Sequence, residues 1–167
     1  MNSAPSARLF LADFIRLQEG GSKPDLIGYY VDGLINVHLP EAAPDPTRDA
    51  PISLTMSALV HVENNSVGQL QSVQIIAPDG KGLSSEPIKV QFSFPPKPGS
   101  IGVIFALPNF PIVAFGKYQM NIVFERQSYA LEFSIRRGPP SPEQVNMGKL
   151  NPVATTAESI PKKKAKS

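Results

Sequence analysis

The stretch that decides the fold covers residues 116–136 and reads GKYQMNIVFERQSYALEFSIR. Apolar and polar residues alternate along both of its halves, which is the period of half-buried β-strands. The apolar positions are Tyr118, Met120, Ile122 and Phe124, and then Tyr129, Leu131, Phe133 and Ile135. The two runs therefore predict an antiparallel hairpin with one apolar face.

The same pattern predicts a register for this hairpin. If Phe124 lies opposite Tyr129, across a four-residue loop at 125–128, all eight apolar side chains share one face. A slip of one residue would turn one of the two strands inside out. In the predicted register Lys117 faces Arg136, and their repulsion predicts fraying at the open end of the hairpin.

The rest of the chain also predicts short strands separated by turns. The strand candidates are residues 9–15, 26–30, 34–39, 52–62, 67–76, 88–94 and 101–107, with a crossing loop at 108–115. We expect residues 67–76 to pair with the strand before them. Gly28, inside a strand candidate, indicates a bulge or a close backbone approach, and Pro78-Asp79-Gly80 predicts a tight turn. Eight or nine strands without a helical period predict an all-β fold, a single antiparallel β-sandwich of immunoglobulin-like arrangement.

Composition limits the domain organisation. The chain has 167 residues, of which 41% are hydrophobic and 18% charged, so it can form one globular domain with a core. The absence of cysteine excludes a disulfide scaffold and a thiolate zinc site. We expect residues 1–7 to be frayed, residues 8–137 to form the sandwich, and residues 138–167 to be a disordered basic tail.

Positive charge is concentrated in the tail. Residues 138–167 carry five lysines and two glutamates, whereas residues 1–137 have a net charge of −1. The cluster at Lys162, Lys163, Lys164 and Lys166 resembles a basic nuclear-import signal and would bind phosphate groups loosely. The alternative is that these lysines only solvate the end of the chain, and this is the interpretation we favour. Nucleic acid is therefore expected as a weak partner of the tail alone.

No apolar segment has the length of a signal-peptide core or of a membrane span. This predicts a cytoplasmic protein that does not enter a membrane.

Few residues suggest chemistry. His38 and His61 are too few for a histidine-rich metal cluster, although a mixed site with Asp32 or Glu63 is an alternative; we expect no metal. Asp13 interrupts an apolar strand, and is either an exposed or backbone-bonded carboxylate or a buried one with a raised pKa.

The candidates for ligand contact are Tyr29 and Tyr30, beside Gly28, which are positioned to line a groove. The sequence contains no nucleophile elbow, no H-E-x-x-H motif and no phosphate-binding glycine loop. We therefore expect no cofactor and no catalytic residue, with a spatially assembled Ser-His-Asp site as a remote alternative.

Two resemblances add expectations. Residues 115–120, FGKYQM, resemble the G-x-Y-x-C corner of immunoglobulin-type sandwiches, with Met120 in place of the cysteine and Ala114 in place of the usual aspartate. The resemblance implies that the Tyr118 hydroxyl bonds back to the preceding loop.

The wider pattern combines LADF at residues 11–14, LIG at 26–28, the PDG turn and the closing GKY hairpin. This set is similar to an uncharacterised family of small bacterial and phage proteins with an A-D-Y/F opening strand. The resemblance covers residues 8–136 and implies a sandwich in a prokaryotic setting, without a catalytic residue.

These observations favour a non-enzymatic binding or interaction module. We expect it to bind another protein, or a second copy of itself, through loops or an exposed strand edge. The alternative is a small-ligand-binding or sequestering protein with a pocket at the end of the sandwich. A hydrolase with a spatially assembled site is the remote alternative.

Overall fold

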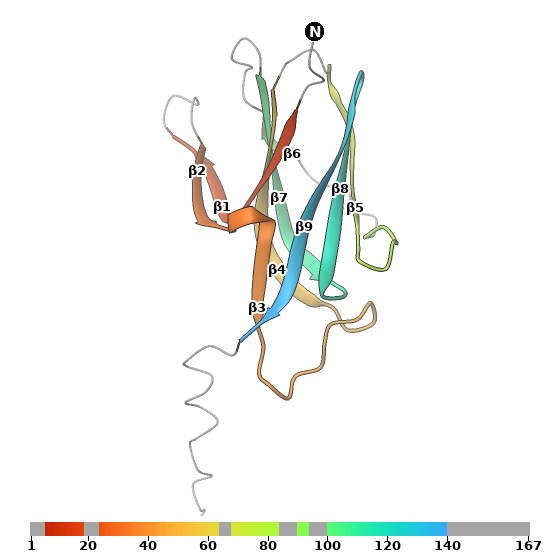
Figure 1. Ribbon diagram of the computed structural model, residues 1–167. Helices are drawn as coiled ribbons and strands as arrows, with labels where there is room; N and C mark the ends of the chain where they lie inside the picture. Colours follow the sequence, from red (N-terminus) through yellow and green to blue (C-terminus); the bar gives the residue numbers. More distant parts are fainter. Residues whose placement is uncertain (1–5, 19–23, 64–67, 84–89, 94–99, 140–167) are drawn as a thin grey trace, which may run out of the picture.

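The computed structural model describes residues 6–18, 24–63, 68–83, 90–93 and 100–139. This part of the chain forms nine strands and one short 3₁₀ helix (Figure 1). In chain order they are β1 (Ala7–Leu17), β2 (Pro24–Tyr29), the 3₁₀ helix η1 (Val31–Gly33), β3 (Leu34–His38), β4 (Ile52–Glu63), β5 (Leu70–Ile76), β6 (Val90–Ser93), β7 (Ser100–Ile112), β8 (Gly116–Phe124) and β9 (Ser128–Gly138). The predicted lysine tail lies outside the described residues.

The strands form two sheets that pack face to face, so the predicted all-β sandwich is confirmed. One sheet has the order β2-β1-β4-β7-β6 and the other has the order β3-β9-β8-β5. The strand pairs are antiparallel except for β3 and β9, which are parallel. The chain leaves the first sheet after β2, passes through η1, and enters the second sheet as β3, which lies parallel to β9.

The terminal hairpin β8–β9 has the predicted face but a different register. Tyr118 lies opposite Phe133, and Ile122 opposite Tyr129, so the pairing is shifted by two residues from the predicted one. A shift of two preserves the face of every side chain, because side chains alternate with period two. The loop begins one residue earlier than predicted, and the Phe124 N–H donates to the Gln127 carbonyl at 2.8 Å.

The corrected register changes the open end of the hairpin. Lys117 faces Ser134 rather than Arg136, and its Nζ lies 2.8 Å from the Glu132 carboxylate. The predicted repulsion between Lys117 and Arg136 is therefore wrong.

Two further expectations about pairing are wrong. β5 does not pair with β4, but with β8 in the other sheet, so the chain crosses between sheets after β4. Residues 108–115 are not wholly a loop, because β7 continues through Pro108 to Ile112 and pairs with the start of β4. Each error concerns partners far apart in sequence, which alternation does not specify.

The core lies between the two sheets and is centred on β8 and β9. Tyr118 stacks on Phe133 with ring centroids 5.3 Å apart, and Phe110 from β7 packs against both rings. The Tyr118 hydroxyl donates to the Ala114 carbonyl at 2.7 Å and accepts from the Val113 N–H at 3.2 Å. This is the bond back to the preceding loop that the tyrosine-corner resemblance implied.

Candidate functional site

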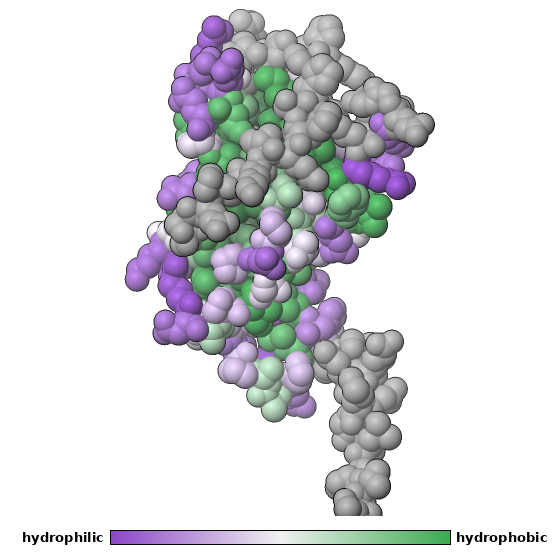
Figure 2. Space-filling view, turned by 180° about the vertical axis from the view of Figure 1, so that it is seen from behind, coloured by the Kyte–Doolittle hydropathy of each residue, from purple (hydrophilic) through white to green (hydrophobic). Residues whose placement is uncertain are grey.

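The β1–β2 hairpin and the 3₁₀ helix η1 that follows it carry the large apolar side chains that are exposed in the described part of the chain. Relative to full exposure, Phe14 is 49% exposed, Ile27 48%, Tyr29 44% and Val31 65%. We call these four residues the hairpin patch. In Figure 1 the hairpin lies beside the sandwich at one edge of the first sheet. Seen from behind, the side of the molecule that carries the hairpin shows hydrophobic and hydrophilic residues next to one another (Figure 2).

Strand pairing places these side chains next to one another along the hairpin. Phe14 lies opposite Ile27, and Ala12 lies opposite Tyr29. The Phe10 ring, two residues earlier on β1, lies with its centroid 6.3 Å from that of Tyr29.

The hairpin patch adjoins a second apolar cluster on the outer face of the five-stranded sheet. Its buried members are Ala12, Ile15, Leu59 and Ile104, with Phe10 and Leu26 packed against them. The neighbouring row of Leu11, Ala58 and Phe105 faces the core between the sheets. The exposure of the apolar side chains increases from Leu59 and Ile104 in the middle of the sheet to Tyr29 at its β2 edge.

Asp13, Gly28 and Tyr30 form the polar element of this hairpin. Gly28 lies across from Asp13 with φ of +67°, and a Cβ at position 28 would overlap the Asp13 carboxylate. The Tyr30 hydroxyl donates to Asp13 Oδ1. The close backbone approach predicted for Gly28 is thus confirmed, and it is the Asp13 side chain that fills the space.

The environment of this pair favours the neutral phenol. Partial burial raises the pKa of Tyr30 well above its ordinary value, and the hydrogen bond to the Asp13 carboxylate and the negative charge of that group raise it further. Asp13 itself is exposed, so the alternative of a buried carboxylate is wrong. The neutral Tyr30 hydroxyl donates to the carboxylate and so fixes the orientation of the ring. In this arrangement the hydroxyl is a hydrogen-bond donor and not a base.

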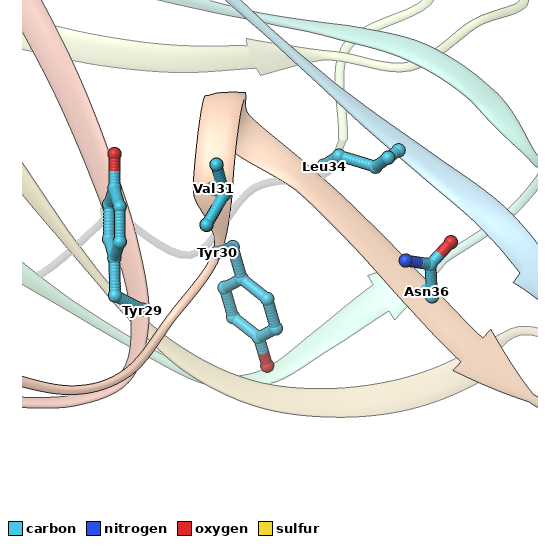
Figure 3. A pocket seen from close by; sticks show the side chains of 5 residues that line it. All are labelled: Tyr29, Tyr30, Val31, Leu34 and Asn36. Carbon is cyan, nitrogen blue, oxygen red and sulfur yellow. The ribbon is translucent and has the colours of Figure 1, made fainter.

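A hollow of about 330 Å³ lies where the chain passes from β2 through η1 to β3. It is lined by Tyr29, Tyr30, Val31, Leu34 and Asn36, which come from these three successive elements (Figure 3). Both tyrosines singled out in the sequence therefore line the same hollow. It lies on the side of the sandwich, at the crossing between sheets, and not at the end where a ligand pocket was expected.

The two histidines lie apart from this hollow and from each other. His38 ends β3 in one sheet, where its Nδ1 contacts the Pro139 carbonyl oxygen. His61 lies in β4 of the other sheet, opposite Gly102. Within the described ranges no three His, Asp or Glu side chains lie close enough together to hold a metal ion. Asp32 and Glu63, the suggested partners of the histidines, are within these ranges. The four tail lysines Lys162, Lys163, Lys164 and Lys166 lie outside those ranges.

An ion pair that the sequence did not indicate holds two loops together. Arg48 Nε lies 2.6 Å from Asp79 Oδ2 and Nη2 lies 2.8 Å from Oδ1, a bidentate contact. The guanidinium also donates to the Lys81 and Gly82 carbonyls. The Arg48 hydrogen bonds, more than the backbone N–H of Lys81, hold the pKa of Asp79 well below its usual range. The Pro78–Gly80 turn was predicted, but its partner 31 residues away was not.

The described part of the chain contains no helix that is long and apolar enough to cross a membrane. Comparison with protein-family models, with curated proteins and with solved structures gave no match to this chain.

Proposed function

We propose that this protein is a non-enzymatic interaction module that binds a protein partner at the β1–β2 hairpin. The observation that carries the proposal is the hairpin patch, in which Phe14, Ile27, Tyr29 and Val31 are each at least 44% exposed. Exposed apolar side chains that form one contiguous surface are typical of protein-binding sites, whereas scattered ones are not. Tyrosine and phenylalanine are also enriched at the centres of such interfaces.

The free edge of β2 supports the same proposal. β2 is the last strand in the described order of its sheet, and it carries two members of the hairpin patch, Ile27 and Tyr29. A partner segment added to this edge would gain main-chain hydrogen bonds from β2 and apolar contact from the patch. This corresponds to binding through a strand edge rather than through the loops.

The immunoglobulin-like arrangement belongs to this proposal too. The order β1-β4-β7-β6 corresponds to strands A, B, E and D of that fold, and β9-β8-β5 corresponds to G, F and C. The Tyr118 bond to the loop before β8 supports the assignment. In this arrangement the β2 strand and η1 are an insertion before β3, and the insertion carries the hairpin patch.

Selection from a random peptide library tests the proposal. The immobilised chain is compared with a Val31→Asp variant, which places a charge at the most exposed member of the patch, and with Ser72→Asp on the exposed face of β5. We expect the selected peptides to lose binding to Val31→Asp and to keep it with Ser72→Asp. Equal binding to both variants would place the interaction elsewhere and contradict the proposal.

The second candidate function is binding of a small ligand in the hollow at η1. It is supported by the apolar and aromatic lining with the Asn36 amide at one side. NMR screening of aromatic amide fragments tests it. Shifts confined to Tyr29, Tyr30 and Leu34, and lost on Leu34→Asp, would favour this candidate over a protein partner.

The remaining expectations stay proposals. The likeness to a bacterial and phage family supports a prokaryotic, cytoplasmic setting, and the lysine tail supports at most weak contact with nucleic acid. The hydrolase alternative has the least support, because His38 and His61 lie in different sheets, and the Nδ1 of His38 contacts a carbonyl oxygen.

A further inference from the structure

The hollow at η1 lies beside two exposed carboxylates. Its lining is largely apolar and aromatic, with the Asn36 amide at one side. Asp13 is exposed and accepts a hydrogen bond from the hydroxyl of Tyr30, which lines the hollow. Asp32, also exposed, follows Val31 directly in η1, and Val31 lines the hollow as well. A group that binds in the hollow therefore binds close to two negative charges.

Neither carboxylate is neutralised within the described part of the chain. Asp13 and Asp32 form no ion pair with a described residue. Five other carboxylates of this part do form ion pairs with an arginine or a lysine, and these are Asp25, Asp45, Glu63, Asp79 and Glu132. An unpaired carboxylate on an exposed surface can contact a cation of a partner without first losing an ion pair of its own.

The arginines of this region leave the charge at the hollow negative. Arg16 of β1 is paired with Asp25 of β2, with its Nε 3.2 Å from the carboxylate. Arg136 of β9 lies opposite Asn36 in the β3–β9 ladder and is a cation beside the hollow. Among the described residues two unpaired carboxylates therefore lie near one guanidinium, which favours a cationic ligand over an anionic one.

The size of the hollow suits one long side chain. Its volume of about 330 Å³ is at the lower end of the range for small-ligand pockets, about 300–1,000 Å³. An arginine can pack its methylene groups against apolar walls such as Val31 and Leu34 while its guanidinium stays near carboxylates and water (Figure 3). A planar guanidinium can also stack on an aromatic ring, and Tyr29 is 44% exposed. The hollow therefore matches an arginine in both size and polarity.

We propose that the partner binds with an arginine in this hollow and an apolar residue on Phe14 and Ile27. Ile27 and Tyr29 are two residues apart on β2, at most about 7 Å, so neighbouring side chains of one segment can reach both places. The inference rests on the proposed interaction surface and names the chemistry of its partner. That partner is a protein segment that carries an arginine next to an apolar side chain.

Peptide selection followed by one isosteric replacement tests the proposal. Peptides selected from a random library on the immobilised chain should be enriched in arginine beside an apolar residue. A synthetic peptide of the selected sequence is then compared with the same peptide in which citrulline, the uncharged isostere, replaces the arginine. Fluorescence anisotropy should show that citrulline weakens binding about tenfold, because contacts with two exposed carboxylates are lost at about two- to fivefold each. Added salt should weaken the arginine peptide more than the citrulline peptide.

Matched variants of the chain locate the charge contact. Asp13→Asn and Asp32→Asn should each weaken the arginine peptide about two- to fivefold and leave the citrulline peptide unchanged. Asparagine keeps an oxygen that can accept from Tyr30, and it tolerates the φ of +55° at position 32. Asp49→Asn, at an exposed aspartate of the β3–β4 loop, is the control and should leave both peptides unchanged.

Arg136→Gln should have the opposite effect. It removes a like charge beside the hollow, so the arginine peptide should bind about two- to fivefold more tightly. Weaker binding of both peptides to this variant would assign Arg136 a structural role instead and contradict the proposal. Val31→Asp should still weaken the arginine peptide, because its carboxylate would lose water against the methylene groups of the arginine.

The failure of this inference differs from failure of the proposed function. Selected peptides without an excess of arginine, or equal affinity of the arginine and citrulline peptides, would overturn the arginine contact. Equal binding of the arginine peptide to the wild type, Asp13→Asn and Asp32→Asn would overturn it as well, since the arginine would then bind elsewhere. If the selected peptides still lose binding on Val31→Asp, the hairpin patch remains the interaction surface for a partner of other chemistry.

Discussion

The Asp13 carboxylate of β1 lies over the backbone of Gly28 on β2, where no residue with a Cβ fits without a shift. This contact fixes the spacing of the two strands at the point where the Tyr30 hydroxyl reaches Asp13. Three members of the hairpin patch, Phe14, Ile27 and Tyr29, lie on the same two strands, so their geometry depends on the contact.

Substitution of Gly28 should show this coupling. Gly28→Ala forces a residue with a Cβ to adopt a φ of +67°, which costs about 1–2 kcal/mol, and adds an overlap with the carboxylate. In an Asp13→Ala background the overlap disappears and only the backbone cost remains. A double-mutant cycle by urea denaturation measures the difference. An equal cost of Gly28→Ala in both backgrounds would refute the contact.

The Tyr30–Asp13 hydrogen bond predicts a dependence of stability on alkaline pH. Burial and Asp13 raise the pKa of Tyr30, so the folded chain keeps the proton where the unfolded chain loses it, above about pH 10. The contribution of Tyr30 is therefore complete below that pH and falls as the pH rises.

Comparison of the wild type with Tyr30→Phe isolates this effect, since the other tyrosines are common to both. Unfolding free energies measured from about pH 8 to about pH 11 should converge as the ordinary tyrosine pKa is passed. A constant difference across this range would mean that Tyr30 does not titrate differently in the folded chain.

The Tyr118 hydroxyl should contribute measurably to stability. Tyr118→Phe leaves the buried Val113 N–H and the Ala114 carbonyl without the bonds they make to it, so we expect a loss of about 1–3 kcal/mol in urea denaturation. Tyr129→Phe is the matched control, because the Tyr129 hydroxyl is buried without a partner among the described residues. That change should be neutral or slightly stabilising. Similar losses at both positions would contradict the tyrosine corner.

The Arg48–Asp79 ion pair should protect its loop from proteolysis. Asp79→Asn removes the negative charge that holds Arg48, so trypsin should cleave after Arg48 faster than in the wild type. Added salt should accelerate cleavage of the wild type in the same direction, because the pair is solvent-accessible and screened. Asp49→Asn, at a neighbouring exposed aspartate, is the control. Unchanged cleavage in Asp79→Asn would show that the pair does not hold the loop.

The sequence predicted the local features of the fold and missed those that depend on distant partners. Alternation from Tyr118 to Ile135 identified the buried face of the terminal hairpin, because the face on which a side chain lies depends only on whether its position in the strand is odd or even. It gave a register two residues away from the observed one, because a shift of two preserves parity. Pairing of β5 with β8 involves strands separated by 39 intervening residues, and no local pattern encodes it.

The candidate site was predicted in part for the same reason. Tyr29, Tyr30 and the close approach at Gly28 were all apparent from three consecutive residues. The exposure of Phe14 and Ile27 was not, because alternation shows which side chains share a face but not whether another element covers that face. That depends on β2 being the last strand of its sheet in the described part of the chain.

The most direct measurement is an NMR titration of the isotope-labelled chain with a peptide selected on the wild type. The proposed surface predicts that perturbed amides concentrate at Phe14, Ile27, Tyr29 and Val31, with little change on β5, β8 and β9. Perturbations confined to the loops at the ends of the sandwich, with the β1–β2 hairpin unchanged, would contradict a binding surface on that hairpin.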